Sequence, residues 1–308
     1  MLGARLIIRR VILGLVLCSL PFSASRAITS LDTAFLNKTV VFFFQADPAG
    51  NATNKLDATG FLIMVPSKVD PNKYPLLVTA RHVVDPVWAG CASTNPTRLF
   101  LRVNKMRFDP GIDSTGVSYI PVDLWKSGTP TWHKSDDDNV DVAVLKAPAE
   151  LMSGNYDVRF LNVRNIGKSE EIAKIGIGSQ TASTGLVPGL QGQNRNAPVF
   201  HFGKIASVPD ETTPFQCVTN ATSRPLRVWW IATTLVPGTS GSPIYFDPLF
   251  PPGADVSAGE PRSMLIGLQS LSVPGADLAG MTPVRYIFDV ISHSVSGDAD
   301  LTLGLPAK

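Results

Sequence analysis

A serine occupies a glycine-rich turn in the last third of the chain, within the run Gly238-Thr239-Ser240-Gly241-Ser242-Pro243. A serine hydroxyl is a poor nucleophile at neutral pH. It needs a general base in contact and backbone N–H donors for the oxyanion that forms after attack. The flanking glycines permit such backbone geometry. Similar turns are common in β-proteins without any catalytic role, so the motif is informative only if the chain also supplies a base and an acid.

An aspartate interrupts an otherwise apolar segment that is predicted to be a strand, residues 140–145. Burying an ionised carboxylate without partners costs several kcal/mol, so Asp141 should be hydrogen-bonded to a specific group, and a histidine is a natural candidate. The alternative is an aspartate at a strand start that bonds to loop backbone. The three aspartates at 136–138 are typical of a solvated loop.

The chain has four histidines, and one of them follows an apolar strand directly. His82 lies in the run Thr79-Ala80-Arg81-His82-Val83-Val84, where small residues let its ring face a cleft. The others, His133, His201 and His293, have settings typical of structural or solvated side chains. The order His82, Asp141, Ser240 matches one of the known orders of catalytic triads.

The predicted fold class is all-β. The chain has 25 glycines and 25 prolines, and short runs of valine, isoleucine, threonine and phenylalanine lie between them, as strands joined by turns require. A break at residues 148–164 divides the chain into two lobes, and apolar residues at helical spacing predict a closing helix at 285–294. The predicted strands are 39–45, 58–65, 74–80, 99–103, 116–124, 140–145, 172–177, 199–207, 226–233, 244–246, 264–271 and 281–284.

The first 27 residues have the pattern of a secretory signal peptide. Arginines precede an apolar run at 11–20, and Ser25-Arg26-Ala27 supplies small residues at the two positions that a signal peptidase reads. A run of about ten residues is shorter than the roughly 20 that span a bilayer, so no stable anchor is expected; a retained anchor is the alternative. Export predicts a periplasmic or extracellular location.

Removal of residues 1–27 leaves 281 residues that are nearly neutral, with 23 basic and 25 acidic side chains. With no basic stripe, this balance argues against nucleic acid or an acidic membrane as a partner. Cys91 and Cys217 then remain, and an oxidising compartment favours a disulfide between them. Two buried thiols that never meet are the alternative, because the sequence does not show whether their Cα atoms come within bridging distance.

The chain resembles the chymotrypsin-fold serine peptidases. It is most similar to the bacterial trypsin-like branch with the glutamyl endopeptidases and the high-temperature-requirement proteases. The similarity spans roughly residues 35–292, and its motifs are residues 59–63, 78–84, 140–145, 237–243 and 266–268. It implies two six-stranded antiparallel β-barrels, about 35–150 and about 165–292, and a short C-terminal helix. Only 68 residues follow Ser240, too few for an appended peptide-binding module as well.

The resemblance also implies roles for single residues. Ser240 would attack the scissile carbonyl, His82 would take and return the proton, and Asp141 would fix the imidazole tautomer. The N–H groups of Gly238 and Ser240 would form the oxyanion hole. No cofactor or metal is implied, and the expected partner is a peptide or protein substrate; the oligomeric state is left open.

The resemblance further places Thr234 at the floor of the substrate pocket, and it aligns Ser270 with a hydroxyl that supports the triad aspartate. Because residue 234 is not an acid, a pocket that selects arginine or lysine is not expected. The pocket is expected to favour substrates with a small or medium apolar residue on the acyl side of the scissile bond. Thr239 replaces the aspartate that pairs with a new N-terminus in digestive zymogens, so that activation route is not expected. Arg81 stands where relatives have a small residue, so its side chain either turns to solvent or perturbs the site.

The predicted function is therefore that of an exported serine endopeptidase acting through an acyl-enzyme. Two alternatives stay open. The first is a catalytically silent β-barrel binding protein that keeps the triad residues but has a collapsed oxyanion hole or a blocked cleft; Arg81 is the feature that favours it. The second is a serine esterase with the same triad.

Overall fold

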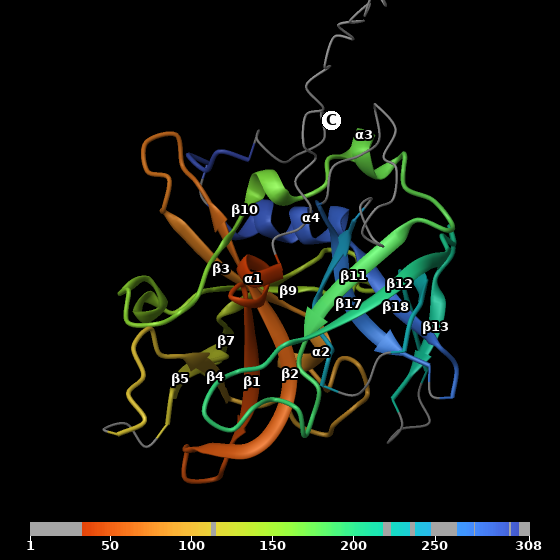
Figure 1. Cartoon of the computed structure of the whole chain (residues 1–308). Helices are drawn as coiled ribbons and strands as arrows, with labels where there is room; N and C mark the ends of the chain where they lie inside the picture. The colour runs from red at the N-terminus through yellow and green to blue at the C-terminus, as the bar shows by residue number, and fades with distance from the viewer. Residues whose placement is uncertain are drawn as a thin grey trace, which may run out of the picture.

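The computed structural model describes residues 33–111, 115–217, 223–234, 238–247, 264–273, 275–295 and 297–301. Two β units lie side by side, one from each half of the chain (Figure 1). The predicted signal peptide lies outside the described residues. No helix in the described part of the chain has the length and apolar character that crossing a membrane requires.

The N-terminal half forms an eight-stranded sheet. Seven strands pair in the order β5-β4-β1-β2-β3-β9-β8, and β10 joins β2 in parallel. Their bounds are β1 (Val40–Ala46), β2 (Ala52–Val65), β3 (Tyr74–Thr79), β4 (Arg98–Asn104), β5 (Val117–Asp123), β8 (Trp132–Lys134), β9 (Ala143–Lys146) and β10 (Leu161–Asn162). β1 is almost wholly apolar because both of its faces are covered: Phe43 packs in the main core, and Phe42 and Phe44 pack in a second cluster.

The C-terminal half closes into a six-stranded barrel, in the order β11-β12-β15-β18-β17-β16. Its strands are β11 (Gln180–Gly185), β12 (Val199–Ser207), β15 (Trp229–Ala232), β16 (Pro243–Phe246), β17 (Met264–Ser272) and β18 (Leu278–Pro283). Ile205, Ile231 and Ile244 belong to the apolar cluster of this unit. The all-β class and the two-unit architecture are thus confirmed. The N-terminal sheet does not close into a barrel among the described strands, because its two end strands, β5 and β8, are not paired with each other.

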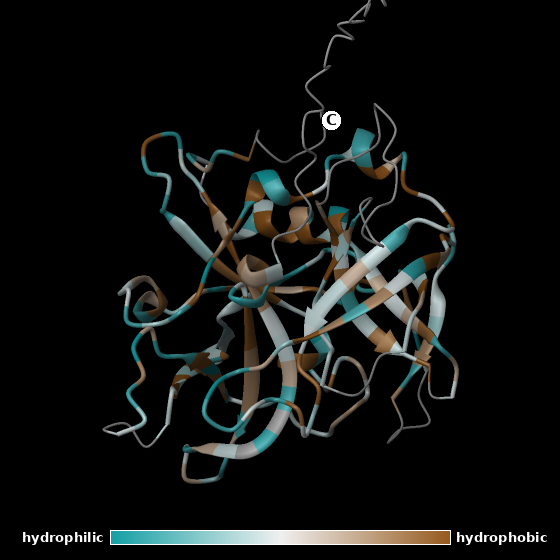
Figure 2. Ribbon diagram, in the orientation of Figure 1, coloured by the Kyte–Doolittle hydropathy of each residue, from teal (hydrophilic) through white to brown (hydrophobic). Residues whose placement is uncertain are grey.

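Helix α4 (Val284–Ser294) confirms the predicted closing helix and ties the two units together. It buries Ile287, Val290 and Ile291 and packs against β9 of the first sheet and β17 of the barrel. Figure 2 shows apolar residues along this helix and along the strands beneath it. The remaining short elements are α1 (Thr33–Asn37), α2 (Arg81–Val84), α3 (Ser169–Ile172), the 3-10 helices η1 (Ala149–Met152) and η2 (Val163–Asn165), and strands β6 (Trp125–Lys126), β7 (Thr129–Pro130), β13 (Thr213–Gln216) and β14 (Ser223–Leu226).

One predicted strand, 172–177, is wrong. The alternating isoleucines there do not line one face of a sheet, because Ile175 is buried and Ile177 is 73% exposed. Gly178, with φ +91°, lies in a turn just before β11. The predicted strand at 140–145 also starts too early, since β9 begins at Ala143 and Asp141 lies in the segment that leads into it.

Candidate active site

Strand pairing brings His82 and Asp141 together. β3 and β9 run antiparallel with Thr79 opposite Ala143, so the segment that follows β3 lies beside the segment that precedes β9. The His82 Nδ1 lies 2.8 Å from Asp141 Oδ2, and the His82 backbone N–H donates to Asp141 Oδ1 at 2.9 Å. Because a carboxylate only accepts, Nδ1 carries the proton and Nε2 is left as the free acceptor.

Asp141 is 1% exposed, and its carboxylate is hydrogen-bonded to both the backbone and the ring of His82. Burial lowers the pKa of His82, but the charge of Asp141, its hydrogen bond and the charge of Asp57 outweigh that effect. The pKa of His82 is therefore raised above its ordinary value of 6.5. The arrangement stabilises the imidazolium that forms when the ring takes a proton.

The turn that carries Ser240 depends on two glycines with positive φ, Gly238 at +97° and Gly241 at +84°. At Gly241 a Cβ atom would lie 2.2 Å from the Thr59 carbonyl oxygen and 2.3 Å from Thr79 Oγ1. Any side chain at 241 would therefore collide with the first sheet.

Thr59 of β2 fastens this turn to the N-terminal unit. Its N–H donates to the Ser240 carbonyl at 2.9 Å, and its hydroxyl donates to the Gly238 carbonyl at 3.0 Å. From the barrel side, the Gly241 N–H donates to the Gln269 carbonyl at 2.8 Å. Among the described residues, the N–H groups of Gly238 and Ser240 have no acceptor. Backbone N–H groups without an acceptor are the kind of donor that an oxyanion hole uses.

The Ser240 hydroxyl has no hydrogen-bond partner among the described residues, His82 included. Catalytic hydrogen bonds are often long in unliganded enzymes and tighten when substrate binds. The structure therefore brings His82 and Asp141 into contact but leaves the serine unpaired.

Arg81 turns neither to solvent nor into the site. It is 6% exposed, its guanidinium pairs with Asp85 at 3.1 Å and with Asp138 at 2.7 Å, and it stacks on the Trp88 ring at 4.2 Å. Burial raises the pKa of Asp138, but hydrogen bonds from Arg81 and Arg224 outweigh this and lower it to about 2. Arg81 thus anchors α2 to the loop before Asp141.

A disulfide joins Cys91 to Cys217, with Cα atoms 5.2 Å apart. Cys217 directly follows β13 of the β13–β14 hairpin, and the Phe215 ring of the same strand lies 6.5 Å from the His82 ring, centroid to centroid. The bridge therefore ties a hairpin of the C-terminal half to the loop that follows the histidine.

The two residues predicted for the substrate pocket have other partners. Thr234 is exposed, and its hydroxyl donates to Asp277 at 2.7 Å. Ser270 is buried, and its hydroxyl is hydrogen-bonded to that of Thr282 in place of the expected Asp141. On the same strand, Gln269 is 1% exposed, and its Oε1 has no hydrogen-bond partner among the residues that the structure describes.

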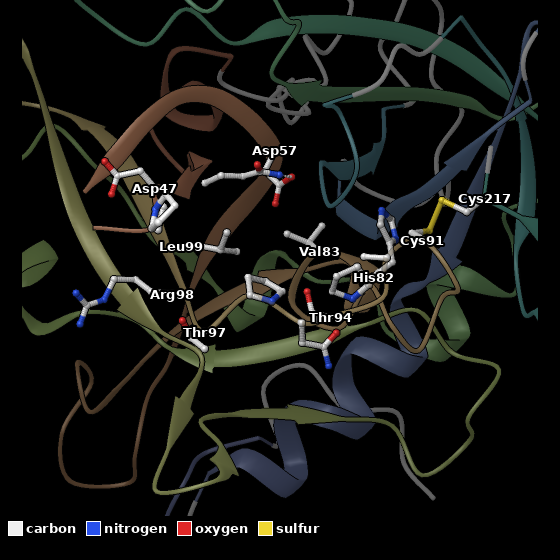
Figure 3. Close-up of a pocket in the computed structure, with 17 residues that line it drawn as sticks. Asp47, Asp57, His82, Val83, Cys91, Thr94, Thr97, Arg98, Leu99 and Cys217 are labelled. Carbon is white, nitrogen blue, oxygen red and sulfur yellow. Dashed lines mark hydrogen bonds between the residues drawn. A yellow bond between two sulfur atoms is a disulfide. The ribbon is translucent and has the colours of Figure 1, made fainter. Parts of the chain in front are cut away.

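A cavity of about 660 Å³ opens beside His82 (Figure 3). Asp57, the Cys91–Cys217 disulfide and the segment from Thr94 to Leu99 contribute to its lining. No group of three or more histidine, cysteine, aspartate or glutamate residues with metal-site geometry occurs in the described ranges. Sequence reasoning missed Asp57 and Thr59, because the contacts of both depend on strand register.

No family model and no curated protein matches the chain. Solved structures similar to it include the MamO protease domain from Magnetospirillum magneticum, at 15% identity and a TM-score of 0.47, with 85% of this chain and 98% of that one covered. The active form of the Rv3671c protease from M. tuberculosis matches at 14% identity and a TM-score of 0.45, with 88% and 92% covered. Similarity this low assigns no function to the chain.

Proposed function

We propose that the chain is an exported serine endopeptidase that uses His82, Asp141 and Ser240. The proposal rests on the Asp141 carboxylate, which accepts hydrogen bonds from both the backbone and the ring of His82. A buried carboxylate held this way fixes the tautomer that a general base needs. The turn at Gly238 and Ser240 supplies the nucleophile and the oxyanion donors.

In the proposed reaction the Ser240 Oγ attacks the scissile carbonyl carbon while His82 Nε2 takes its proton. The oxyanion accepts from the N–H groups of Gly238 and Ser240, each worth about 2.7–4 kcal/mol in comparable sites. His82 then gives the proton to the leaving amine, and the C–N bond breaks to leave an acyl-enzyme. Water attacks the ester by the same route and releases the acid.

The test is labelling by a fluorophosphonate probe, with the adduct located by mass spectrometry. Wild type is expected to label at Ser240, and His82→Ala should abolish labelling. His133→Ala is the matched control, because His133 is exposed on β8 and its loss should leave labelling unchanged. If the folded wild type stays unlabelled at neutral pH, the proposal fails.

A catalytically silent binding protein is the second candidate, favoured by the unpaired Ser240 hydroxyl among the described residues. It predicts a folded, unlabelled protein that still binds peptides. For a labelled enzyme, matched amide and ester substrates separate a peptidase from an esterase. We expect amide hydrolysis, with small or medium apolar residues on the acyl side of the bond.

Export is proposed from residues 1–27, with cleavage after Ala27. Expression with an intact N-terminus is expected to release a protein beginning at Ile28, which N-terminal sequencing detects. A product that keeps residues 1–27 and stays with the membrane would support the retained anchor instead.

A further inference from the structure

The cavity beside His82 contains a carboxylate that is not a member of the proposed triad. Asp57 lies on β2 and is half-buried. Its Oδ1 accepts from Gln45 Nε2 at 2.9 Å, and Oδ2 has no partner among the described residues. Figure 3 shows the side chain directed toward Val83, next to His82. An acidic group therefore lines the space beside the histidine.

A β-bulge places this side chain. In the pairing of β1 with β2, Phe43 lies opposite Ala58 and Phe44 lies opposite Leu56, so Asp57 is the extra residue. Bulges re-aim a side chain and occur often beside active sites. Two residues later, Thr59 binds the Ser240 turn, so the bulge fixes Asp57 relative to the nucleophile.

The Asp57 carboxylate makes no ion pair with the basic residues around the cavity among the described residues. Arg98, a basic lining residue, pairs with Asp123, and Lys55 is exposed and makes no ion pair with Asp57 among the described residues. Asp47 also lines the cavity, but its carboxylate already accepts from Asn51. Burial raises the pKa of Asp57 and outweighs the Gln45 hydrogen bond and the charges of His82 and Lys55, which lower it.

We propose that Asp57 and this cavity form a subsite for a cationic side chain of the polypeptide substrate, a lysine or an arginine. The inference rests on the proposed peptidase function and is distinct from the apolar pocket expected on the acyl side. The volume is within the roughly 300–1,000 Å³ of ligand pockets. Gln45 holds one carboxylate oxygen, which leaves Oδ2 to accept a charge-assisted hydrogen bond.

The test measures peptide binding to the Ser240→Ala variant, so that turnover is not required. The probes are acetylated and amidated alanine octapeptides with one lysine at each position in turn, and their norleucine counterparts. At one or more positions lysine should bind about tenfold more tightly than norleucine, the scale of one charge-assisted hydrogen bond. Asp57→Asn in the same background should abolish that preference.

Asp47→Asn is the matched control, since it neutralises a second carboxylate of the same cavity and should keep the preference. Asp57→Ser is used if Asp57→Asn does not melt cooperatively. The subsite is overturned if lysine gives no gain at any position, or if the gain survives the loss of Asp57. The fluorophosphonate probe carries no lysine side chain, so labelling of the wild type does not depend on the subsite. Labelling therefore tests the peptidase proposal independently of the subsite.

Discussion

At the scale of single residues, Asp141 determines which nitrogen of His82 is the base. We predict that Asp141→Asn reduces kcat/KM for a peptide substrate by about 10⁴-fold, because an amide can donate to Nδ1 and so favour the wrong tautomer. Steady-state kinetics measures the loss, and thermal unfolding of the same sample shows whether the fold is kept. Loss of less than about tenfold in a folded variant would remove Asp141 from the mechanism.

The charges around His82 also set the pH range in which its ring is a base. Its pKa is raised above 6.5, so the ring stays protonated to a higher pH and the acid limb of kcat/KM should have its midpoint above about 6.5. Asp57→Asn removes one negative charge that favours the imidazolium, so this midpoint should move to lower pH. A pH profile of the wild type and of Asp57→Asn measures the shift. The control variant Asp47→Asn should keep the midpoint of the wild type. A move to higher pH would contradict the assignment.

At the scale of elements, the Ser240 turn keeps its shape through close approach to the first sheet. We predict that Gly241→Ala abolishes labelling of Ser240 and destabilises the fold, since its Cβ would lie 2.2 Å from the Thr59 carbonyl oxygen. Gly128→Ala is the control: Gly128 has a similar φ, +79°, and a Cβ at this position would have no other atom within 4 Å. It should cost only about 1 kcal/mol and keep full labelling. Probe labelling and thermal unfolding of both variants measure whether the loss is specific to position 241.

How far the sequence predicts this site depends on whether a contact is local. Ser240 stood out through its glycines and His82 through the apolar strand before it. Asp57 is polar within a strand of ordinary composition, and its position beside His82 follows from a one-residue register shift, which no local pattern records. The sequence suggests that Arg81 disturbs the site, because its pairing with Asp85 and Asp138 follows only from the folded chain. The strand predicted at 172–177 failed for the same reason, since alternation alone does not show which isoleucine finds a core.

At the scale of the whole molecule, the β13–β14 hairpin crosses from the C-terminal half to the histidine loop, where Leu226 and Phe215 pack with Trp88 in one apolar cluster. The hairpin is also fixed by the Cys91–Cys217 disulfide, which closes a loop of 126 residues, and by the Arg224–Asp138 ion pair at 2.8 Å. We predict that replacing both cysteines by serine lowers the free energy of unfolding by about 2–4 kcal/mol, mainly because the unfolded chain gains freedom. Labelling of Ser240 should change little, because the ion pair and the apolar cluster still hold the hairpin. Denaturant unfolding and labelling rates measure the two effects.

Removing both the disulfide and the ion pair tests whether the hairpin positions His82. Arg224→Ala alone removes a partly exposed ion pair, which is usually worth about 0–1 kcal/mol, and its effect on labelling should be small. In the variant that lacks the cysteines as well, the hairpin loses its covalent link and this ionic link, so Phe215 is held less firmly against His82 and labelling should fall by more than the product of the two separate effects. Independent effects would mean that the hairpin stabilises the fold without positioning the histidine. A fall larger than that product would make the link between the two halves a requirement for catalysis.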